Sequence, residues 1–210
     1  MGHERALLAR GQVVVGLDEV GRGSLAGPLA VGAVVVDDER EPPHGLADSK
    51  ALTPRRREAL VPLLCEWARD WSLGWASARE IDEWGIRLAL SVAATRALDA
   101  LMVTPSYALI DGPINFLRPP RDVALGTDVP PTPYAALAHD TLVKGDARSA
   151  VIAAASVIAK VARDEVMREL HVLHPSFGWD ENKGYGTAAH RASIRAVGPT
   201  AQHRRTWKLA

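Results

Sequence analysis

Acidic side chains stand where two apolar stretches of the sequence end. Asp18 and Glu19 follow a Val-rich stretch, and Asp111 follows the stretch Tyr-Ala-Leu-Ile. If the two stretches are neighbouring strands, their ends bring three carboxylates together, and Asp146, just before an Ala-rich helical segment, can join them. The open alternative is that each acid is a turn or helix-cap residue.

Four carboxylates gathered at one point would require a metal ion, because like charges repel unless a cation is present. Carboxylate oxygens suit Mg²⁺ or Mn²⁺ better than zinc. Two such ions, about 3.5–4 Å apart, could activate a water and stabilise the leaving oxygen of a phosphodiester. The single cysteine and the seven histidines show no zinc-binding arrangement. The acids therefore favour phosphodiester hydrolysis if they meet.

Two glycine-flanked motifs could contact a ligand. The cluster Gly21-Arg22-Gly23 could bring backbone N–H groups close to a bound molecule, although an ordinary hairpin turn is the commoner use of such a cluster. A dinucleotide-binding loop is disfavoured by the glycine spacing and by the two carboxylates just before it. Tyr185 lies between two glycines, where it could stack on a sugar or base or could simply anchor the core.

Hydrophobic periodicity predicts alternating strands and helices. Strands are expected over 12–17, 28–36, 71–76 and 107–110, and helices over about 53–68, 78–101, 150–170 and 188–197. Thr53-Pro54 is typical of an N-cap followed by proline at the first helical position. The Pro-rich segment 113–142 shows little periodicity, so we expect a long surface loop. This order of elements predicts an α/β fold with a mixed sheet.

The length fits one domain, or one domain with a small appended lobe. Of the 210 residues 47% are hydrophobic, enough for a substantial core, so disorder is disfavoured. The 25 basic and 25 acidic residues cancel, but no acid follows Glu181, and this basic tail could neutralise phosphates or be a solvated terminus. We find no signal peptide and no apolar span of about 20 residues, so we expect a soluble, cytoplasmic protein.

Four segments in order resemble the bacterial type 2 ribonucleases H, the ribonuclease HII family, from about Val13 to Trp207. They are GLDEVGRGSLAGP at 16–28, DSK at 48–50, the passage 144–164 with KGD, AAAS, Lys160 and a final RD, and KGYGT at 183–187. The strand end Ile110-Asp111-Gly112 lies between the second and the third. Each segment alone is modest support, whereas all four in this order are highly specific.

The resemblance implies a ribonuclease H-like mixed sheet flanked by helices, with a small C-terminal helical lobe. Residues 1–210 would form a single catalytic domain, with the ribonuclease H-like core at about 11–172 and a basic lobe at about 173–210. The segment between Asp111 and Asp146 is longer than is usual in the family. We expect a monomer that does not bind membranes.

The same resemblance assigns the site. Catalytic and metal-binding roles, with two Mg²⁺ or Mn²⁺ ions, fall to Asp18, Glu19, Asp111 and Asp146. Substrate-binding roles fall to Gly21, Arg22, Gly23, Lys50 and Tyr185. In this assignment the glycine loop senses the ribose 2′-hydroxyl, the tyrosine packs on the neighbouring deoxyribose, and the lysine contacts phosphate. The 2′-hydroxyl is the group that separates RNA from DNA locally.

The resemblance implies an endoribonuclease that hydrolyses RNA in RNA/DNA hybrids. It also implies cleavage 5′ of single ribonucleotides embedded in DNA duplexes, leaving 3′-hydroxyl and 5′-phosphate ends. Two alternatives stay open. A resolvase-like nuclease of the same fold would use the acids but would not need the glycine loop and Tyr185. A non-catalytic nucleic-acid binding module would be hindered by clustered carboxylates, which repel phosphates.

Overall fold

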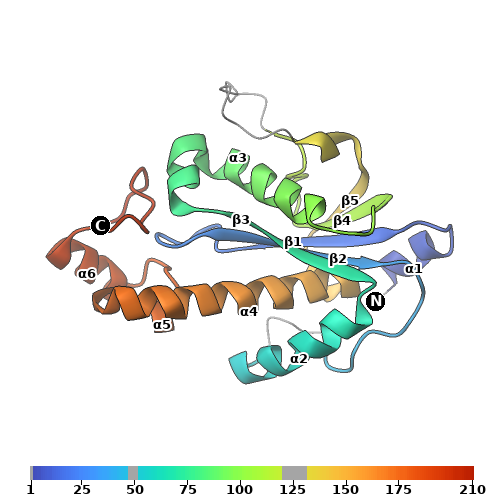
Figure 1. Cartoon of the computed structure of the whole chain (residues 1–210), viewed down its shortest axis with the longest axis horizontal. Helices are drawn as coiled ribbons and strands as arrows, with labels where there is room; N and C mark the ends of the chain where they lie inside the picture. Colours follow the sequence, from blue (N-terminus) through green and yellow to red (C-terminus); the bar gives the residue numbers. More distant parts are fainter. Residues whose placement is uncertain (1, 47–51, 120–131) are drawn as a thin grey trace.

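A mixed five-stranded sheet in the order β3-β2-β1-β4-β5 runs through the middle of the molecule (Figure 1). The computed structural model describes residues 2–46, 52–119 and 132–210. The strands are β1 (Val14–Val20), β2 (Leu29–Val36), β3 (Asp70–Ala76), β4 (Tyr107–Asp111) and β5 (Ala138–Leu142). Because β1 pairs antiparallel with β2 and parallel with β4, the carboxyl ends of β1 and β4 lie at the same edge.

Helices cover both faces of the sheet. They are α1 (His3–Leu8), α2 (Pro54–Trp67), α3 (Ala78–Asp99), α4 (Ala150–Leu173), α5 (Trp179–Asn182) and α6 (Ala188–Val197), with single 3₁₀ turns η1 (Pro133–Ala136), η2 (Gly145–Ala147) and η3 (Pro175–Phe177). Figure 1 shows α3 on one face and α2 and α4 on the other, and a buried apolar cluster lies beneath each. No helix among the described residues has the length and apolar character that a membrane crossing requires.

Glycines in the strands let α4 lie directly on the sheet. A Cβ atom at Gly16 would meet the carbonyl carbon of Val151 at 2.3 Å, and one at Gly32 would meet the carbonyl oxygen of Ala155 at 2.4 Å. Both obstacles are backbone atoms of α4, which cannot rotate aside as a side chain can. The close approach fixes α4 against β1 and β2 and sets Ser156 against the end of β1.

The predicted α/β fold with a mixed sheet and flanking helices is confirmed, and each predicted strand and helix is present. Thr53 caps α2 as predicted, its hydroxyl oxygen accepting the N–H of Arg56 at 3.4 Å. The predicted end of the first strand is wrong. β1 continues through Asp18 and Glu19 to Val20, because β2 pairs with it along that whole length. The alternative that these two acids are turn residues is therefore excluded.

The surface loop predicted over 113–142 is wrong in its last part, where β5 forms an edge strand parallel to β4. Hydrophobic periodicity could not find this strand, because only Leu142 in it is buried and pairing with β4 holds it in place. Helix α1 was not predicted either. With six residues it is too short to show a helical period.

The C-terminal residues pack on the connection between β1 and β2. A third apolar cluster joins the two parts: Leu25, Ala26, Met167, Phe177, Trp179 and Ile194. Behind it two histidines are fully buried, with His190 accepting a hydrogen bond from Trp179 Nε1 at 3.0 Å and lying 3.2 Å from His203, Nε2 to Nε2. The loop after β1 is thus supported from beneath by the last residues of the chain.

Candidate active site

Three of the four predicted acids line one hollow at the carboxyl ends of β1 and β4. Leu17 of β1 pairs with Ile110 of β4, so Asp18 and Asp111 are the next residues on adjacent parallel strands. Together with Glu19 they line a cavity of 330 Å³ whose other walls come from α2 and α4. The expected meeting of the two strand ends is present in the structure.

Asp18 is the most enclosed of the three, with 7% of its surface exposed. Burial raises the pKa of Asp18 from 3.8 to about 8, a hydrogen bond from the Ser156 hydroxyl partly offsets this, and the negative charges of Asp111 and Glu19 add to it. A metal ion at the hollow would favour the charged form of this carboxyl.

Glu19 and Asp111 are held by different partners. Burial raises the pKa of Glu19, Arg22 lowers it, and the charge of Asp111 raises it again. The Arg22 contact is long, at 3.4 Å from Nη1 to Oε1 of Glu19. Asp111 accepts a hydrogen bond from the backbone N–H of Gly145 at 2.7 Å. The Gly145 contact orients Asp111, and the Arg22 contact holds Glu19 more loosely.

The fourth acid, Asp146, is placed next to the hollow rather than in it. It is 4% exposed in η2 and follows Gly145, whose N–H contacts Asp111, but it is not among the residues that line the cavity. Within 2–46, 52–119 and 132–210, no three acidic, histidine or cysteine side chains converge into a ready metal site. Mutual repulsion favours this spread arrangement. The donors are nevertheless all carboxylate oxygens, which fit a hard divalent cation.

Two cations and a hydroxyl complete the hollow. Arg57 of α2 and Lys160 of α4 line it, and Lys160 also pairs with Asp164. Burial lowers the pKa of Lys160, and Asp164 acts in the opposite direction. Arg57 belongs to none of the motifs in the sequence, and Ser156 is part of a motif without a role of its own. A signal for Ser156 did exist, since it is the one polar side chain between Ala150 and Ala159.

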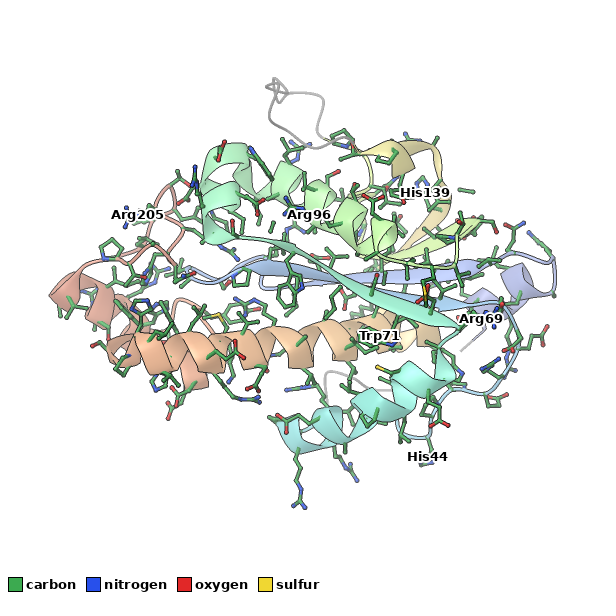
Figure 2. The ribbon with its side chains drawn as sticks, viewed as in Figure 1. His44, Arg69, Trp71, Arg96, His139 and Arg205 are labelled. Atoms are coloured by element: carbon green, nitrogen blue, oxygen red, sulfur yellow. The ribbon has the colours of Figure 1, made fainter. Side chains whose placement is uncertain are left out.

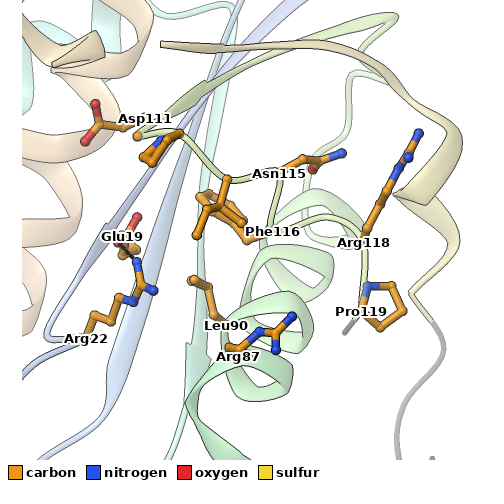
Figure 3. A pocket seen from close by; sticks show the side chains of 12 residues that line it. Glu19, Arg22, Arg87, Leu90, Asp111, Asn115, Phe116, Arg118 and Pro119 are labelled. Carbon is orange, nitrogen blue, oxygen red and sulfur yellow. Dashed lines mark hydrogen bonds and ion pairs between the residues drawn. The ribbon is translucent and has the colours of Figure 1, made fainter. Parts of the chain in front are cut away.

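A second cavity, of 410 Å³, adjoins the first on the α3 side of the sheet and shares Glu19 and Asp111 with it. Figure 3 shows Glu19 next to Arg22, and Asp111 turned away from Arg87 and Arg118. The remaining lining is largely apolar: Leu90, Pro113, Ile114, Phe116 and Pro119. Guanidinium groups around an apolar floor suit the phosphates and bases of a nucleic-acid strand.

The structure joins the segment just after the glycine loop to the segment that carries Tyr185. The backbone N–H groups of Leu25 and Ala26 donate to the carbonyl oxygen of Gly184 at 2.7 and 3.2 Å. The Tyr185 side chain is at the surface, 38% exposed, and its ring centre lies 5.7 Å from the Arg163 guanidinium carbon. The alternative of a core-anchoring tyrosine does not fit this exposure. Lys50 lies outside the described residues.

The two glycines of the loop differ in what they permit. Gly21 has a φ of +82°, and a Cβ atom there would meet Arg163 Nε at 2.1 Å, so this position requires glycine. Gly23 has nothing within 4 Å of an added Cβ atom. The protein's own packing therefore demands glycine at Gly21 but not at Gly23, where the open space faces away from the protein.

The basic tail does not act as one surface. Arg204 is 0% exposed and donates to the carbonyl oxygens of Gly21 and Arg22 at 2.6 and 2.8 Å. The expectation that the tail's basic residues neutralise phosphates is wrong for this residue, because its guanidinium points inward. Its neighbour Arg205 is exposed.

Comparisons with known proteins agree with this architecture. The model of the family described as ribonuclease HII matches residues 15–210. The ribonuclease HII of Jannaschia sp. (strain CCS1) is 48% identical over 197 residues, which are 94% of this chain and 90% of that protein.

Solved structures show the same fold. Ribonuclease H2 from Pyrococcus horikoshii OT3 superimposes with a TM-score of 0.72 at 29% identity, covering 94% of this chain and 95% of that one. Bst-RNase HIII, solved in complex with Mn²⁺, has a TM-score of 0.67 at 20% identity, with 97% and 70% covered. Since the family model spans nearly all of the chain that carries this hollow, the chain belongs to the ribonuclease HII family and is a hydrolase of the ribonuclease H type.

Proposed function

We propose that this chain is an endoribonuclease that hydrolyses the RNA strand of RNA/DNA hybrids and cuts 5′ of single ribonucleotides embedded in DNA duplexes. The products carry 3′-hydroxyl and 5′-phosphate ends. One observation carries the proposal: a hollow lined by Asp18, Glu19 and Asp111 opens directly beside a loop that is hydrogen-bonded to the segment bearing Tyr185.

Asp18, Glu19, Asp111 and Asp146 are the proposed catalytic residues and the ligands of two Mg²⁺ or Mn²⁺ ions. When bound, such ions supply activation of a water molecule and charge stabilisation at the leaving 3′-oxygen. The raised pKa of Asp18, caused by burial and by its acidic neighbours, supports this role, because a cation would favour the charged carboxylate there.

Residues around the acids orient the site. The Ser156 hydroxyl lies beside Asp18 and lowers the pKa of Asp18, and the Gly145 N–H donates to Asp111, which orients that carboxylate. Arg57 and Lys160, which line the same hollow, can hold the phosphate oxygens of the strand that is cut. In this proposal these two side chains hold a phosphodiester against the carboxylate edge.

The loop Gly21-Arg22-Gly23 and Tyr185 supply the selection of ribose. Open space at Gly23 allows a sugar to approach the backbone, where an N–H or carbonyl group can bond a 2′-hydroxyl. The partly exposed ring of Tyr185 offers a flat apolar surface to the neighbouring sugar. Lys50 is proposed as a phosphate contact from the sequence motif alone.

We further propose that residues 1–210 act as one catalytic domain, a core at about 11–172 with a basic lobe at about 173–210, working as a monomer on nucleic acid in the cytoplasm. The apolar cluster that joins Leu25 and Ala26 to Trp179 and Ile194 supports a single unit, because it ties the lobe to the loop beside the acids.

The test is cleavage of a labelled DNA duplex that contains one ribonucleotide, with Mg²⁺, with Mn²⁺ and with a chelator. An all-DNA duplex, a long RNA/DNA hybrid and a four-way DNA junction run alongside. We expect one metal-dependent cut 5′ of the ribonucleotide, cleavage of the hybrid, and no cleavage of either all-DNA substrate.

Each other outcome removes a defined part of the proposal. Cleavage of the hybrid without a cut at the single ribonucleotide would remove the sensing role of the glycine loop and Tyr185. Cleavage of junction DNA would favour the resolvase-like alternative. Folded protein that binds nucleic acid but cuts nothing would leave only the binding module.

A further inference from the structure

Two arginines are completely buried beneath the connection 21–28 that joins β1 to β2. Arg163 comes from α4 and Arg204 from the segment after α6, and each has 0% of its surface exposed. Their acceptors are almost all backbone carbonyl oxygens: Arg204 bonds Gly21, Arg22 and Gly27, and Arg163 bonds Ala26, Pro28, Lys183 and the Ser24 hydroxyl. We call this pair the arginine clamp.

In the clamp, the carboxylates of Asp164 and Asp82 act on Arg163 and Arg204 only as nearby charges and not as close ion-pair partners. In the described part of the chain neither guanidinium forms an ion pair, and Arg204 Nε has no acceptor. Burial lowers the pKa of Arg204 to about 9, and the nearby charge of Arg163 contributes in the same direction. Burying a guanidinium group that is hydrogen-bonded mainly to carbonyl oxygens costs desolvation free energy, so the clamp does not serve core stability alone. What these contacts do determine is the direction of each carbonyl group in the connection.

Carbonyl direction fixes the direction of the next N–H group. In a planar trans peptide the C=O of one residue and the N–H of the following residue point to opposite sides, and the described residues contain no cis peptide bond. Arg204 draws the carbonyl oxygens of Gly21 and Arg22 inward, at 2.6 and 2.8 Å. The N–H groups of Arg22 and Gly23 are consequently directed outward.

The outward side is the one that a nucleic acid would approach. Nothing lies within 4 Å of an added Cβ atom at Gly23, and the preceding strand residue Glu19 lines both cavities of the candidate site. The clamp also connects the two proposed sensing elements. Arg163 donates to the carbonyl oxygen of Lys183 and lies beneath the ring of Tyr185, while it contacts the connection through Ser24.

We propose that Arg204 is a positioning residue for ribose recognition: by holding the Gly21 and Arg22 carbonyls inward, it presents the Arg22 and Gly23 N–H groups to the sugar-phosphate backbone at the cleavage position. Arg163 keeps the loop and Tyr185 in register. This inference rests on the proposed function. It assigns Arg204 to contacts within the protein instead of a contact with phosphate.

The variant Arg204→Lys tests it, because lysine keeps the charge but loses the planar fork that reaches three carbonyls at once. With the single-ribonucleotide duplex we expect kcat to fall about 10- to 100-fold, as for other residues that orient a site from behind. KM and its salt dependence should stay near the wild-type values. A phosphate contact would behave differently, since lysine would largely preserve it.

The matched comparison is Arg205→Gln, which removes one charge from the exposed neighbour on the outside of the same segment (Figure 2). Arg204→Gln is measured with it. If Arg204 served phosphate, Arg204→Gln would raise KM and flatten its salt dependence by about one charge. That result, or wild-type kcat in Arg204→Lys, overturns the proposal.

A measurement without any variant covers the case in which these proteins do not fold. In the metal-free wild type, the backbone amide signals of Arg22 and Gly23 should exchange rapidly with solvent and shift when the single-ribonucleotide duplex is added, whereas the amide of Ser24, which donates to Gly21, should exchange more slowly. Protected or unshifted Arg22 and Gly23 amides would refute the outward orientation. If the wild type cuts no ribonucleotide at all, the proposed function has failed, while the exchange rates still decide the loop geometry.

Discussion

Buried charge is compensated differently in the hollow at the end of β1 and in the arginine clamp beneath the connection 21–28. In the hollow, burial raises the pKa values of Asp18 and Glu19, the charge of Asp111 adds to both shifts, and no three acidic side chains converge among the described residues. In the clamp, Arg163 and Arg204 are equally buried but each guanidinium is surrounded by carbonyl oxygens. A site with unbalanced charge is prepared to take up a ligand of opposite charge, whereas one balanced by its own backbone is prepared to hold a shape.

The largest effect should come from Asp18→Asn. This change keeps the shape of the side chain and removes its charge, and we expect cleavage to fall about 10³-fold or more, the loss that several kcal/mol of metal stabilisation implies. The free energy of unfolding should not decrease, because a buried charge has been removed from the hollow. Single-turnover cleavage and urea denaturation measure the two quantities.

Thermal melting with and without Mg²⁺ provides the control for that variant. The ion should raise the melting temperature of the wild type and not that of Asp18→Asn, because only the former offers the charged carboxylate. A well-folded Asp18→Asn protein that cuts normally would show that the hollow is not the catalytic site.

Alanine substitutions at Gly21 and Gly23 should distinguish a residue that packs on the clamp from one that faces the substrate. Gly21→Ala forces a side chain into a left-handed conformation against Arg163, and we expect a loss of more than about 2 kcal/mol in unfolding free energy. Gly23→Ala should change stability by less than about 0.5 kcal/mol and still reduce cleavage of the single-ribonucleotide duplex about tenfold or more. Equal stability losses in the two variants would contradict the distinction.

Ser156→Ala should reduce the activity or the metal affinity of the hollow without abolishing it. The variant leaves Asp18 without the hydroxyl that orients it, and removal of such a supporting bond typically costs about 10- to 100-fold in activity or metal affinity. Activity titrated against Mg²⁺ concentration gives the measurement. Ser176→Ala, at an exposed position far along the chain, is the matched control and should titrate as the wild type does.

The smallest effect concerns the histidine pair behind the clamp. Burial lowers the pKa of His203 from 6.5 to about 4, with the charges of His190, His174 and Arg205 acting in the same direction. The folded state therefore binds fewer protons than the unfolded state between these two values, so stability is lost as the pH falls through that window. His203→Gln should lose less stability than the wild type between pH 7.5 and 5 in urea denaturation. An equal loss would show that this histidine does not carry the acid sensitivity.

Much of the architecture could be predicted from sequence because it is recorded in local patterns. Apolar stretches that end in acids predicted β1 and β4, and Thr53-Pro54 predicted the start of α2. β5 escaped because an exposed edge strand is held by backbone pairing, which leaves no hydrophobic alternation. Asp146 was correctly placed just before α4, but its position outside the hollow depends on the η2 turn, which no periodicity reveals.

The arginine clamp lies beyond the reach of pattern reasoning for a different reason. Arg22 and Arg204 are 182 residues apart in sequence, and nothing near either residue indicates that one carbonyl and one guanidinium will meet. By composition Arg204 looks like part of a basic tail, and only the folded chain turns it inward. The role of a side chain cannot be predicted from local sequence when its partners are backbone atoms far away in the sequence.

That same separation has a consequence for the order of events during synthesis. Contacts between residues far apart in sequence form late in folding, because a long loop must close before they are made. β1 and its acids leave the ribosome well before Arg204 is added, so the loop beside them takes its final geometry only after Arg204 has been made. On the proposed function, a nascent chain carries the groups that can cut a phosphodiester before it carries the means to choose which one.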